Sequence, residues 1–449
     1  MTDMVIHDTL SGELTALRPR DPGRVGIYAC GPTVYSRIHI GNARPFVVFS
    51  LLARFLAHEG HDVTLVINVT DVNDKIYDAA RAQQRPSAEL AAEMTEHYIS
   101  DTSALGLGRP DHEPLASETI GPILDYIEAL LERGHAYAAD GDVYFRVRSD
   151  AGYGSLSHRR LDSMDQGEGV EGAALKEDPL DFALWKAHKP GEDTAWDSPW
   201  GRGRPGWHIE CSAMAEACLG VGFDIHGGGS DLVFPHHENE AAQTRAARGH
   251  ELTRLWMHNG MIQLTGEKMA KSAGNIAPLH EVLARYGRDA VVMYLVSGHY
   301  RQPLSFSEAA LEQAVANVKR IREAGRCLAA GESPAELGEI RDRFFAALAR
   351  DFNTPEALSV MNEWIARSGS HERGAPGDSH LREMLGVLGL EGLLEPDVQA
   401  PAEVRELAEQ RERARSERDF AAADRLRDEL ARLGWEVRDG AQGPSLLPL

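Results

Sequence analysis

The chain has few cysteines and no long apolar run. Four cysteines among 449 residues are too few for a disulfide-stapled secreted scaffold, and no signal peptide is visible. We therefore expect a cytoplasmic protein, in the reducing compartment. No apolar stretch is long enough to predict a membrane span, so no membrane partner is expected.

Positive charge is also scarce. Lysine and arginine total 47 against 69 acidic residues, which gives a formal net charge of −22 at pH 7. An acidic surface argues against indiscriminate nucleic-acid binding, because contacts to phosphate supply most of that affinity. A structured RNA would need a local basic face. The remaining composition, 43% hydrophobic and 26% charged, is ordinary for a soluble globular protein of two or three domains.

The most informative stretch that is present covers residues 28–42 and reads YACGPTVYSRIHIGN. Alternating apolar residues predict a strand over residues 25–29, and apolar residues recur at helical spacing over 45–59. A second alternating strand is expected over 61–70. Together they predict a parallel strand–helix–strand unit whose ligands bind beyond the carboxyl ends of the strands. The candidate residues at that end are Cys30, Thr33, His39, Gly41 and Asn42.

This stretch contains neither a Walker-type phosphate loop nor a GxGxxG fingerprint. His39 precedes the start of a helix, where it can donate to phosphate oxygens, and Gly41 lets a flat base approach the backbone closely. Taken alone, a surface turn with an incidental histidine explains the pattern equally well.

A second motif lies far downstream, where residues 268–272 read KMAKS in a Gly-flanked loop. HIGN and KMAKS together resemble the HIGH and KMSKS pair of the class I aminoacyl-tRNA synthetases. The resemblance implies an α/β fold with a Rossmann-like parallel-sheet core, and it implies that His39, Lys268 and Lys271 are catalytic. It also implies an ATP site, with Mg²⁺ accompanying the ATP, made of Thr33, His39, Gly41, Asn42, Lys268 and Lys271.

Two positions depart from these motifs. Asn42 replaces the second histidine of HIGH, and Ala270 replaces the serine of KMSKS. Asn42 keeps a hydrogen-bond donor at short reach, so we expect nucleotide binding to survive. Ala270 removes a hydroxyl but leaves both lysines, so we expect a modest effect on loop closure and the same type of reaction.

Another set of residues has the spacing of metal ligands. Pro235 is a favourable first residue for a helix, which would place His236 and Glu240 one turn apart on one face. With two soft ligands, Cys30 and Cys211, they form a Cys₂HisGlu set suited to one tetrahedral Zn²⁺. Taken singly, each has an ordinary alternative, because a cysteine that ends a strand is usually core and a lone His or Glu on a helix is usually solvated.

The other two cysteines are poorer candidates for this ion. Two helical turns would set Cys218 about 10 Å from Cys211, too far to share one metal. We expect Cys218 and Cys327 to be small buried hydrophobic residues.

Four fragments, YACGPTVY, GWHIECSAMA, FDIHGGGSDL and FPHHENE, are similar to cysteinyl-tRNA synthetases, and the likeness runs from about residue 20 to the C-terminus. This resemblance implies that ATP and L-cysteine give cysteinyl-adenylate, and that the cysteinyl group then passes to the 3′ end of tRNA-Cys. It implies that the zinc ion selects the substrate thiolate, and that the amino-acid site is formed by Cys30, Thr70, Trp207 and Asp231. From the residues alone, Thr70 and Asp71 could equally cap the next helix.

We expect six segments along the chain. They are a lead-in over residues 1–22 with a strand near residue 5, two halves of a nucleotide-binding core over 23–133 and 206–260, an insertion over 134–205, a KMAKS loop with a helical connector over 261–310, and an all-α anticodon-binding region over 311–449. In the insertion, an aromatic-rich linker over 181–186 carries Trp185, for which packing is the expected role. Asn353 or Thr354 is expected to cap a later helix.

The tail beyond residue 401 alternates arginines with acids on predicted helices and ends in a short strand over 435–438. A solvated charged face is the simplest interpretation. Arginines beside an exposed Trp435 also suit stacking and phosphate contact with single-stranded RNA. A monomer is favoured.

Three other functions fit part of the pattern. A ligase that joins cysteine to an amino-sugar would share the fold, the zinc and the adenylation, but it has no use for the long C-terminal helical region. A zinc hydrolase is suggested by His237-Glu238, but the position of its second histidine is Ala241. A non-catalytic, zinc-stapled RNA-binding module predicts no ATP–pyrophosphate exchange with any amino acid.

Overall fold

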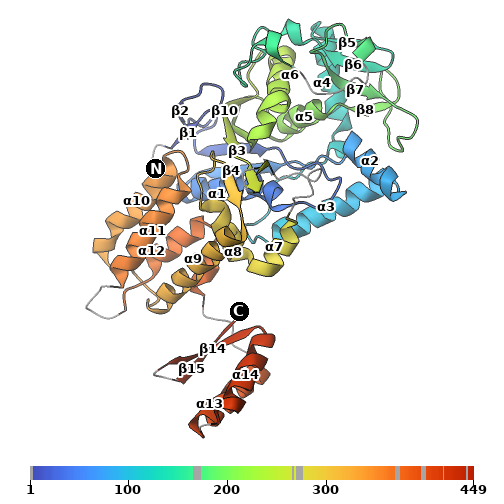
Figure 1. The fold of residues 1–449 in the computed structure, drawn as a ribbon. Helices are drawn as coiled ribbons and strands as arrows, with labels where there is room; N and C mark the ends of the chain where they lie inside the picture. The colour runs from blue at the N-terminus through green and yellow to red at the C-terminus, as the bar shows by residue number, and fades with distance from the viewer. Residues whose placement is uncertain are drawn as a thin grey trace. The chain divides into compact units, whose positions relative to one another are not determined.

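The structure is a computed structural model, and it describes residues 4–164, 173–264, 267–268, 277–369, 375–395, 401–417, 419–440 and 443–448. The chain forms two compact units, Met1–Leu393 and Leu394–Leu449. In Figure 1 the larger unit runs from β1 to α12 and the smaller unit from α13 to β15.

A four-stranded parallel sheet lies at the centre of the larger unit, with the strand order β10–β9–β3–β4. Its strands are β3 (Arg24–Ala29), β4 (Asp62–Ile67), β9 (Phe223–Gly229) and β10 (Thr253–Asn259). The predicted parallel core is therefore confirmed, including the pairing of β3 with β4. The second half of β9 is histidine and glycine, and a Cβ at Gly227 would lie 2.0 Å from the ring of Phe49. Only glycine allows the neighbouring helix to approach this closely.

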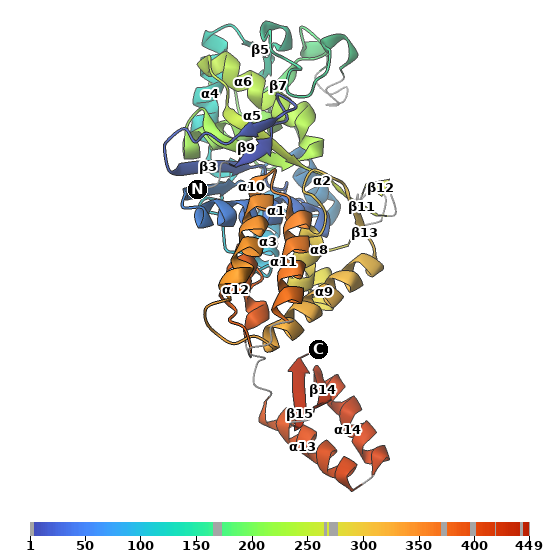
Figure 2. The same ribbon diagram turned by 90° about the vertical axis from the view of Figure 1, so that its left-hand side faces the viewer.

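Helix α1 (Ile40–His58) connects β3 to β4 and lies on one face of the sheet, while α5 (Trp207–Leu219) lies on the other (Figures 1 and 2). α1 begins at Ile40 rather than at residue 45, because the side chain of His39 caps it and Pro45 is accommodated inside it. Among the described helices, α1 alone is long and apolar enough to span a membrane by length and composition, which the sequence analysis did not anticipate. Of its apolar window, 67% is buried inside the protein, as in a core helix.

Three helices follow β4: α2 (Asp74–Gln83), α3 (Ser87–Ser103) and α4 (Ile120–Glu132). They lead into a separate antiparallel sheet with the order β5–β6–β7–β8. Its strands are β5 (Ala136–Ala139), β6 (Asp142–Phe145), β7 (Phe182–Ala187) and β8 (Gly203–Pro205).

Strand β7 occupies the segment that was expected to be a linker. The sequence shows no alternation there because the first four residues of β7 are all buried. Trp185 in this strand is fully buried and meets the ring of Trp200 edge to face at 6.2 Å, which confirms its packing role.

The rest of the larger unit is mainly helical. The helices are α6 (Glu238–Arg248), α7 (Leu279–Tyr286), α8 (Arg288–Val296), α9 (Glu308–Arg326), α10 (Gly338–Ala349), α11 (Thr354–Ser368) and α12 (Ser379–Val387). Two small sheets accompany them, one of β1 (Val5–His7) with β2 (Leu14–Ala16) and one of β11 (Ile262–Leu264), β12 (Glu267–Lys268) and β13 (Leu304–Phe306). Asn353 caps α11 as predicted, accepting from the backbone N–H of Glu356 at 3.2 Å.

The expectation that Cys327 is buried is wrong. This residue follows the last turn of α9 and is exposed, while Cys218 near the end of α5 is half-buried. A position just past a helix end has few neighbours to cover it, which composition alone does not reveal.

A buried arginine on α1 connects three segments of the larger unit. The guanidinium of Arg44 donates to the carbonyl oxygens of Gly260 at 2.6 Å, Met261 at 3.4 Å and His299 at 3.1 Å. Burial lowers the pKa of Arg44 to about 10, so the group still carries its charge at neutral pH. The start of α1 is therefore tied to the link between β10 and β11.

The smaller unit consists of α13 (Ala402–Ser416), α14 (Phe420–Arg432), β14 (Trp435–Gly440) and β15 (Gly443–Pro448). The strand expected near residue 435 is confirmed, and its antiparallel pairing with β15 corrects the all-α description of this region. Trp435 packs with Val404 and Leu430 and is only 8% exposed, so the expectation of an exposed tryptophan is wrong. Among the described residues of this unit, the exposed arginines are Arg405, Arg413, Arg425, Arg427 and Arg432.

Candidate active site

A cleft of about 620 Å³ lies at the carboxyl end of β3. Its lining brings together most of the residues that the sequence analysis proposed as ligand contacts. They are Cys30, Thr33, His39, Gly41, Asn42, Trp207 and Asp231. Their positions follow from the parallel sheet, because the carboxyl ends of β3, β4, β9 and β10 meet at one edge.

Thr70 does not line this cleft. It is buried, and its backbone bridges to that of Thr33, so it lies directly behind the lining. Neither Thr70 nor Asp71 caps α2, because Asn73 does so by accepting from the N–H of Lys75 at 3.1 Å. Asp71 instead accepts from the N–H of Ser117 at 2.9 Å.

The two motif lysines lie at the edge of the described chain. The backbone of Lys268 belongs to β12 and pairs with Gln263 on β11. The side chain of Lys268, together with Ala270 and Lys271, lies outside the described residues. Their roles stay predictions.

The HIGN motif forms the first turn of α1. His39 Nδ1 accepts from the N–H of Gly41 at 3.0 Å, and Asn42 Oδ1 accepts from the N–H of His39 at 3.2 Å. Because Nδ1 is the acceptor, the neutral ring carries its proton on Nε2. A Cβ at Gly41 would lie 2.8 Å from the His39 ring, so glycine is required for the imidazole to fold over the helix start. Asn42 therefore contributes an acceptor to the cap, a role that the sequence analysis did not assign to it.

The four proposed metal ligands converge beside this cleft. Cys30 follows β3, Cys211 lies on α5, His236 lies in the π-helical turn Val233–His237 just before α6, and Glu240 lies in the first turn of α6; all four are buried. Their ligand atoms lie within 4.8 Å of one another. The Cys30 sulfur is 3.7 Å from the sulfur of Cys211 and 3.7 Å from Glu240 Oε1, and His236 Nε2 is 3.1 Å from Glu240 Oε1. At zinc–ligand distances of about 2.0–2.3 Å, tetrahedral ligand atoms lie about 3.3–3.8 Å apart, so the set fits one Zn²⁺ with little movement.

His236 is also oriented as a metal ligand requires. Its second ring nitrogen, Nδ1, lies 2.9 Å from Nδ1 of His208, and its ring stacks on Trp207 with centroids 4.3 Å apart. A hydrogen bond on the far nitrogen fixes the tautomer and ring orientation of a ligating histidine.

The structure adds histidines that the sequence analysis did not assign to this metal site. His226 and His237 form an alternative donor set with Cys30 and Glu240. His237 Nε2 lies 3.3 Å from the Cys30 sulfur, and its Nδ1 lies 2.7 Å from His258 Nε2. His226 and His258 lie on β9 and β10, so the convergence of parallel strands at one edge was the signal that could have found them.

Burial controls the protonation of these groups. Burial raises the pKa of the Cys30 thiol well above its usual range, and the neighbouring Cys211 adds to this effect. The hydrogen bond with Cys30 lowers the pKa of Cys211, but burial and the carboxylate of Glu240 raise it on balance. Burial lowers the pKa values of His236 and His237 well below the usual value, which keeps both imidazoles neutral. Neutral imidazoles are ready ligands, and a divalent cation reverses the effect on the thiols by favouring their deprotonated form.

Comparison with known proteins identifies the fold. Residues 16–316 match the family model of the class I (C) tRNA synthetase catalytic domain, and residues 397–443 match that of the cysteinyl-tRNA ligase anticodon binding domain. Methionyl-tRNA synthetase of Mycobacterium tuberculosis, solved with methionyl-adenylate, has a TM-score of 0.61 at 16% identity and covers 83% of this chain and 89% of its own. The LeuRS ternary complex of Agrobacterium radiobacter K84 has a TM-score of 0.61 at 12% identity, covering 85% and 86%. The fold is that of a class I tRNA synthetase.

Curated relatives narrow this class. The cysteine–tRNA ligase of Alkalilimnicola ehrlichii is 47% identical over 456 residues and that of Halorhodospira halophila 46% identical over 453, each match covering 98% of both chains. The chain belongs to the cysteine–tRNA ligase family.

Proposed function

We propose that the protein activates L-cysteine with ATP and transfers the cysteinyl group to the 3′ end of tRNA-Cys. The observation that carries this proposal is the buried set of two sulfurs, an imidazole and a carboxylate beside the nucleotide-sized cleft. In the first step the cysteine carboxylate attacks the α-phosphate of ATP and pyrophosphate leaves. In the second step a ribose hydroxyl of the tRNA attacks the activated carbonyl and AMP leaves.

Cys30, Cys211, His236 and Glu240 would hold one Zn²⁺, since their donor atoms are close enough and two of them are the soft sulfurs that Zn²⁺ favours. The bound ion would supply a soft Lewis acid that prefers a thiolate to a hydroxyl, which separates cysteine from serine where pocket shape cannot. Trp207 both stacks on His236 and lines the cleft, so it would hold the imidazole in place while forming a wall for the amino acid.

Asp231 and Thr70 complete the proposed amino-acid site in different ways. The Asp231 carboxylate lines the cleft and would accept from the substrate ammonium group. Thr70 supports the lining from behind through its backbone bridge to Thr33. Its role is therefore positioning, by keeping the turn after β3 in register.

ATP would bind where the cleft meets α1. The N-terminus of this 19-residue helix carries the positive end of the helix dipole, which favours phosphate. His39 would donate to a phosphate oxygen from Nε2, and Gly41 lets the nucleotide approach the backbone. Lys268 and Lys271 would meet the charge that develops on the pyrophosphate. Mg²⁺ would accompany the ATP.

The smaller unit would recognise the RNA. Its matched family model and its exposed arginines, Arg405, Arg413, Arg425, Arg427 and Arg432, support contact with the anticodon region. Acidic neighbours on the same helices would limit the basic area, which suits a specific partner better than indiscriminate binding. We further propose a cytoplasmic monomer.

The test is cysteine-dependent ATP–pyrophosphate exchange, measured with each of the twenty amino acids, followed by charging of tRNA-Cys. We expect exchange with cysteine alone and charging of this tRNA in preference to others. Exchange with cysteine but no charging of any tRNA would instead favour the cysteine–amino-sugar ligase. Absence of exchange with every amino acid would contradict the proposal.

A further inference from the structure

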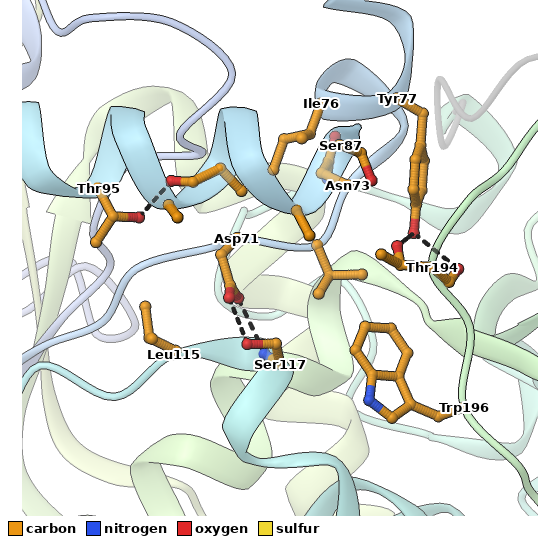
Figure 3. Close-up of a pocket in the computed structure, with 14 residues that line it drawn as sticks. Asp71, Asn73, Ile76, Tyr77, Ser87, Thr95, Leu115, Ser117, Thr194 and Trp196 are labelled. Carbon is orange, nitrogen blue, oxygen red and sulfur yellow. Dashed lines mark hydrogen bonds between the residues drawn. The ribbon is translucent and has the colours of Figure 1, made fainter. Parts of the chain in front are cut away.

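A second cavity, of about 380 Å³, lies beside the cleft, and among the described residues the two linings share none. It is enclosed by the turn after β4, by α2 and α3, by the segment before α4 and by the loop between β7 and β8 (Figure 3). Asp71, Val72 and Asn73 line this cavity, whereas Lys75, two residues further on, lines the cleft. The two spaces therefore lie on either side of one short segment.

One wall of the cavity is the indole ring of Trp196. Its backbone is fixed to Gly203, with the Trp196 N–H donating at 2.7 Å and the Gly203 N–H donating in return at 2.9 Å. Part of the ring packs against the apolar core of the protein. The ring is half-buried, and Figure 3 shows it across the cavity from Asp71.

The loop that carries this tryptophan is pinned to the opposite helices. Asp193 accepts from the N–H of Ser87 at 2.7 Å and also from its hydroxyl. The hydroxyl of Thr194 lies 2.7 Å from that of Tyr77, a contact visible in Figure 3. The cavity is thus built before any ligand arrives, which lowers the entropy lost on binding.

Asp71 and Asn73 offer polar groups to the cavity. Asp71 accepts from the N–H and the hydroxyl of Ser117, and each of its carboxylate oxygens has a second lone pair to offer. Asn73 uses its carbonyl oxygen to cap α2, and its amide group supplies donors. The rest of the lining is mainly apolar or small, as at Val72, Ile76, Ala88, Ala91, Ala92 and Leu115.

A flat heterocycle with donors and acceptors on its edge matches this lining. An aromatic face is the platform on which unpaired bases stack, and a carboxylate with an amide can bond the base edge. The substrate of the proposed function has such bases, because a tRNA must bring its single-stranded 3′ end into the adjoining cleft.

We propose that this cavity receives one unpaired nucleobase of the tRNA 3′ strand, stacked on Trp196 and bonded at its edge by Asp71 and Asn73. This inference rests on the proposed function, since the RNA is the one to be charged. Lys75 is exposed beside Asn73 and on the cleft side of the segment. It is suitably placed to meet a phosphate of a strand that passes from one space to the other.

The test uses tRNA-Cys that carries the fluorescent base 2-aminopurine at one unpaired position of the 3′ strand, with one transcript for each position. Stacking quenches this fluorophore. We expect the full-length, zinc-loaded protein to quench one position, Trp196→Phe to keep the quenching and Trp196→Ala to lose it. Quenching at no position, or quenching that Trp196→Ala leaves unchanged, would overturn the proposal.

A second variant narrows the cavity without changing the tryptophan. Ala92 is an exposed residue of α3 that lines the cavity, so Ala92→Leu adds bulk at its edge, and Ala82→Leu, on an exposed position of α2 outside the lining, is its matched control. We expect kcat/KM for tRNA to fall about 5- to 100-fold in Trp196→Ala and in Ala92→Leu, the range for losing one stacked base, and to stay unchanged in Ala82→Leu. Cysteine-dependent exchange should persist in all three, which shows that each is folded.

Adenosine, added as a free competitor, distinguishes the two possible occupants of the cavity, a base of the tRNA and the base of a free nucleoside. If adenosine binds in the wild-type protein but not in Ala92→Leu, while Ala92→Leu charges tRNA normally, the cavity is a nucleoside site and the RNA proposal is wrong. Absence of cysteine-dependent exchange in the wild-type protein would contradict the proposed function itself. The quenching assay tests the base-binding role of the cavity independently of that result.

Discussion

Two adjacent histidines offer a direct test of which side chains would hold the proposed zinc ion. His236 belongs to the set with Cys211, and His237 belongs to the set with His226, while Cys30 and Glu240 are common to both. Four-ligand structural zinc sites have apparent binding free energies of about 10–16 kcal/mol, or about 2.5–4 kcal/mol for each ligand. Replacing His236 with Ala should therefore raise the zinc Kd about 100- to 1,000-fold.

His237→Ala is the matched control for this experiment. In the set with Cys211, His237 only supports a ligand from outside, through its 3.3 Å contact with the Cys30 sulfur. Losing such support typically weakens metal binding about 10- to 100-fold, so His237→Ala should be clearly the milder variant. The Kd of each is measured by competition with a chromophoric chelator, with thermal unfolding as a check on folding. If His237→Ala proves the more damaging change, the assignment is refuted and the zinc belongs with His226.

Three further predictions concern the substrates. On cobalt-substituted protein, cysteine should produce a new sulfur-to-metal charge-transfer band and serine should not, and identical spectra would make the metal purely structural. Lys271→Ala should slow adenylate formation about 10²- to 10³-fold in a single-turnover assay with little change in cysteine affinity, whereas an unchanged rate would remove this residue from the reaction. Deleting the smaller unit, Leu394–Leu449, should preserve cysteine-dependent exchange and sharply reduce charging of tRNA-Cys, and normal charging by the shortened chain would contradict its role in RNA recognition.

The structure shows why such a deletion must not begin earlier. From the sequence alone, residues 311–449 are expected to form one helical region. Helices α9 to α12 nevertheless belong to the larger unit, where Arg54 on α1 donates to the carbonyl of Gly386 at 2.6 Å and the ring of His58 stacks on Phe345 at 4.2 Å. Removing them would expose the outer side of α1.

Much of the core could be predicted because its signals are local. In the strand–helix–strand unit, apolar residues alternate along the strands and recur at helical spacing along the helix. The Cys₂HisGlu set combines ligand chemistry with the one-turn spacing of His236 and Glu240. β9 could not be predicted in this way, because His226 and three glycines suit a strand only where a helix packs closely against it. The sequence analysis did not predict β7 as a strand, because a strand that is buried on both faces shows no alternation of apolar and polar residues.

Side-chain environment was harder to predict than secondary structure. Whether Trp435 is buried and Cys327 exposed depends on which elements pack against them, and no periodicity carries that information. The histidines at 226, 237 and 258 are far apart in sequence, and they converge only because three separate segments end at the same edge of the fold. The cavity beside Trp196 is likewise formed by five segments, and none of them has a recognisable motif.

The hydrogen bonds of Arg44 hold the start of α1, which forms part of the proposed ATP site, against the chain at Gly260, Met261 and His299. The HIGN turn, residues 39–42, ends two positions before Arg44 on α1. The carbonyls of Gly260 and Met261, which Arg44 holds, lie just before strands β11 and β12, and these strands lead to the KMAKS segment. One side chain thus fixes the position of the first turn of α1 relative to the chain just before β11. A lysine at this position could not reproduce that arrangement, because a single ammonium lacks the planar fork with which one guanidinium bonds three carbonyls on two separate segments.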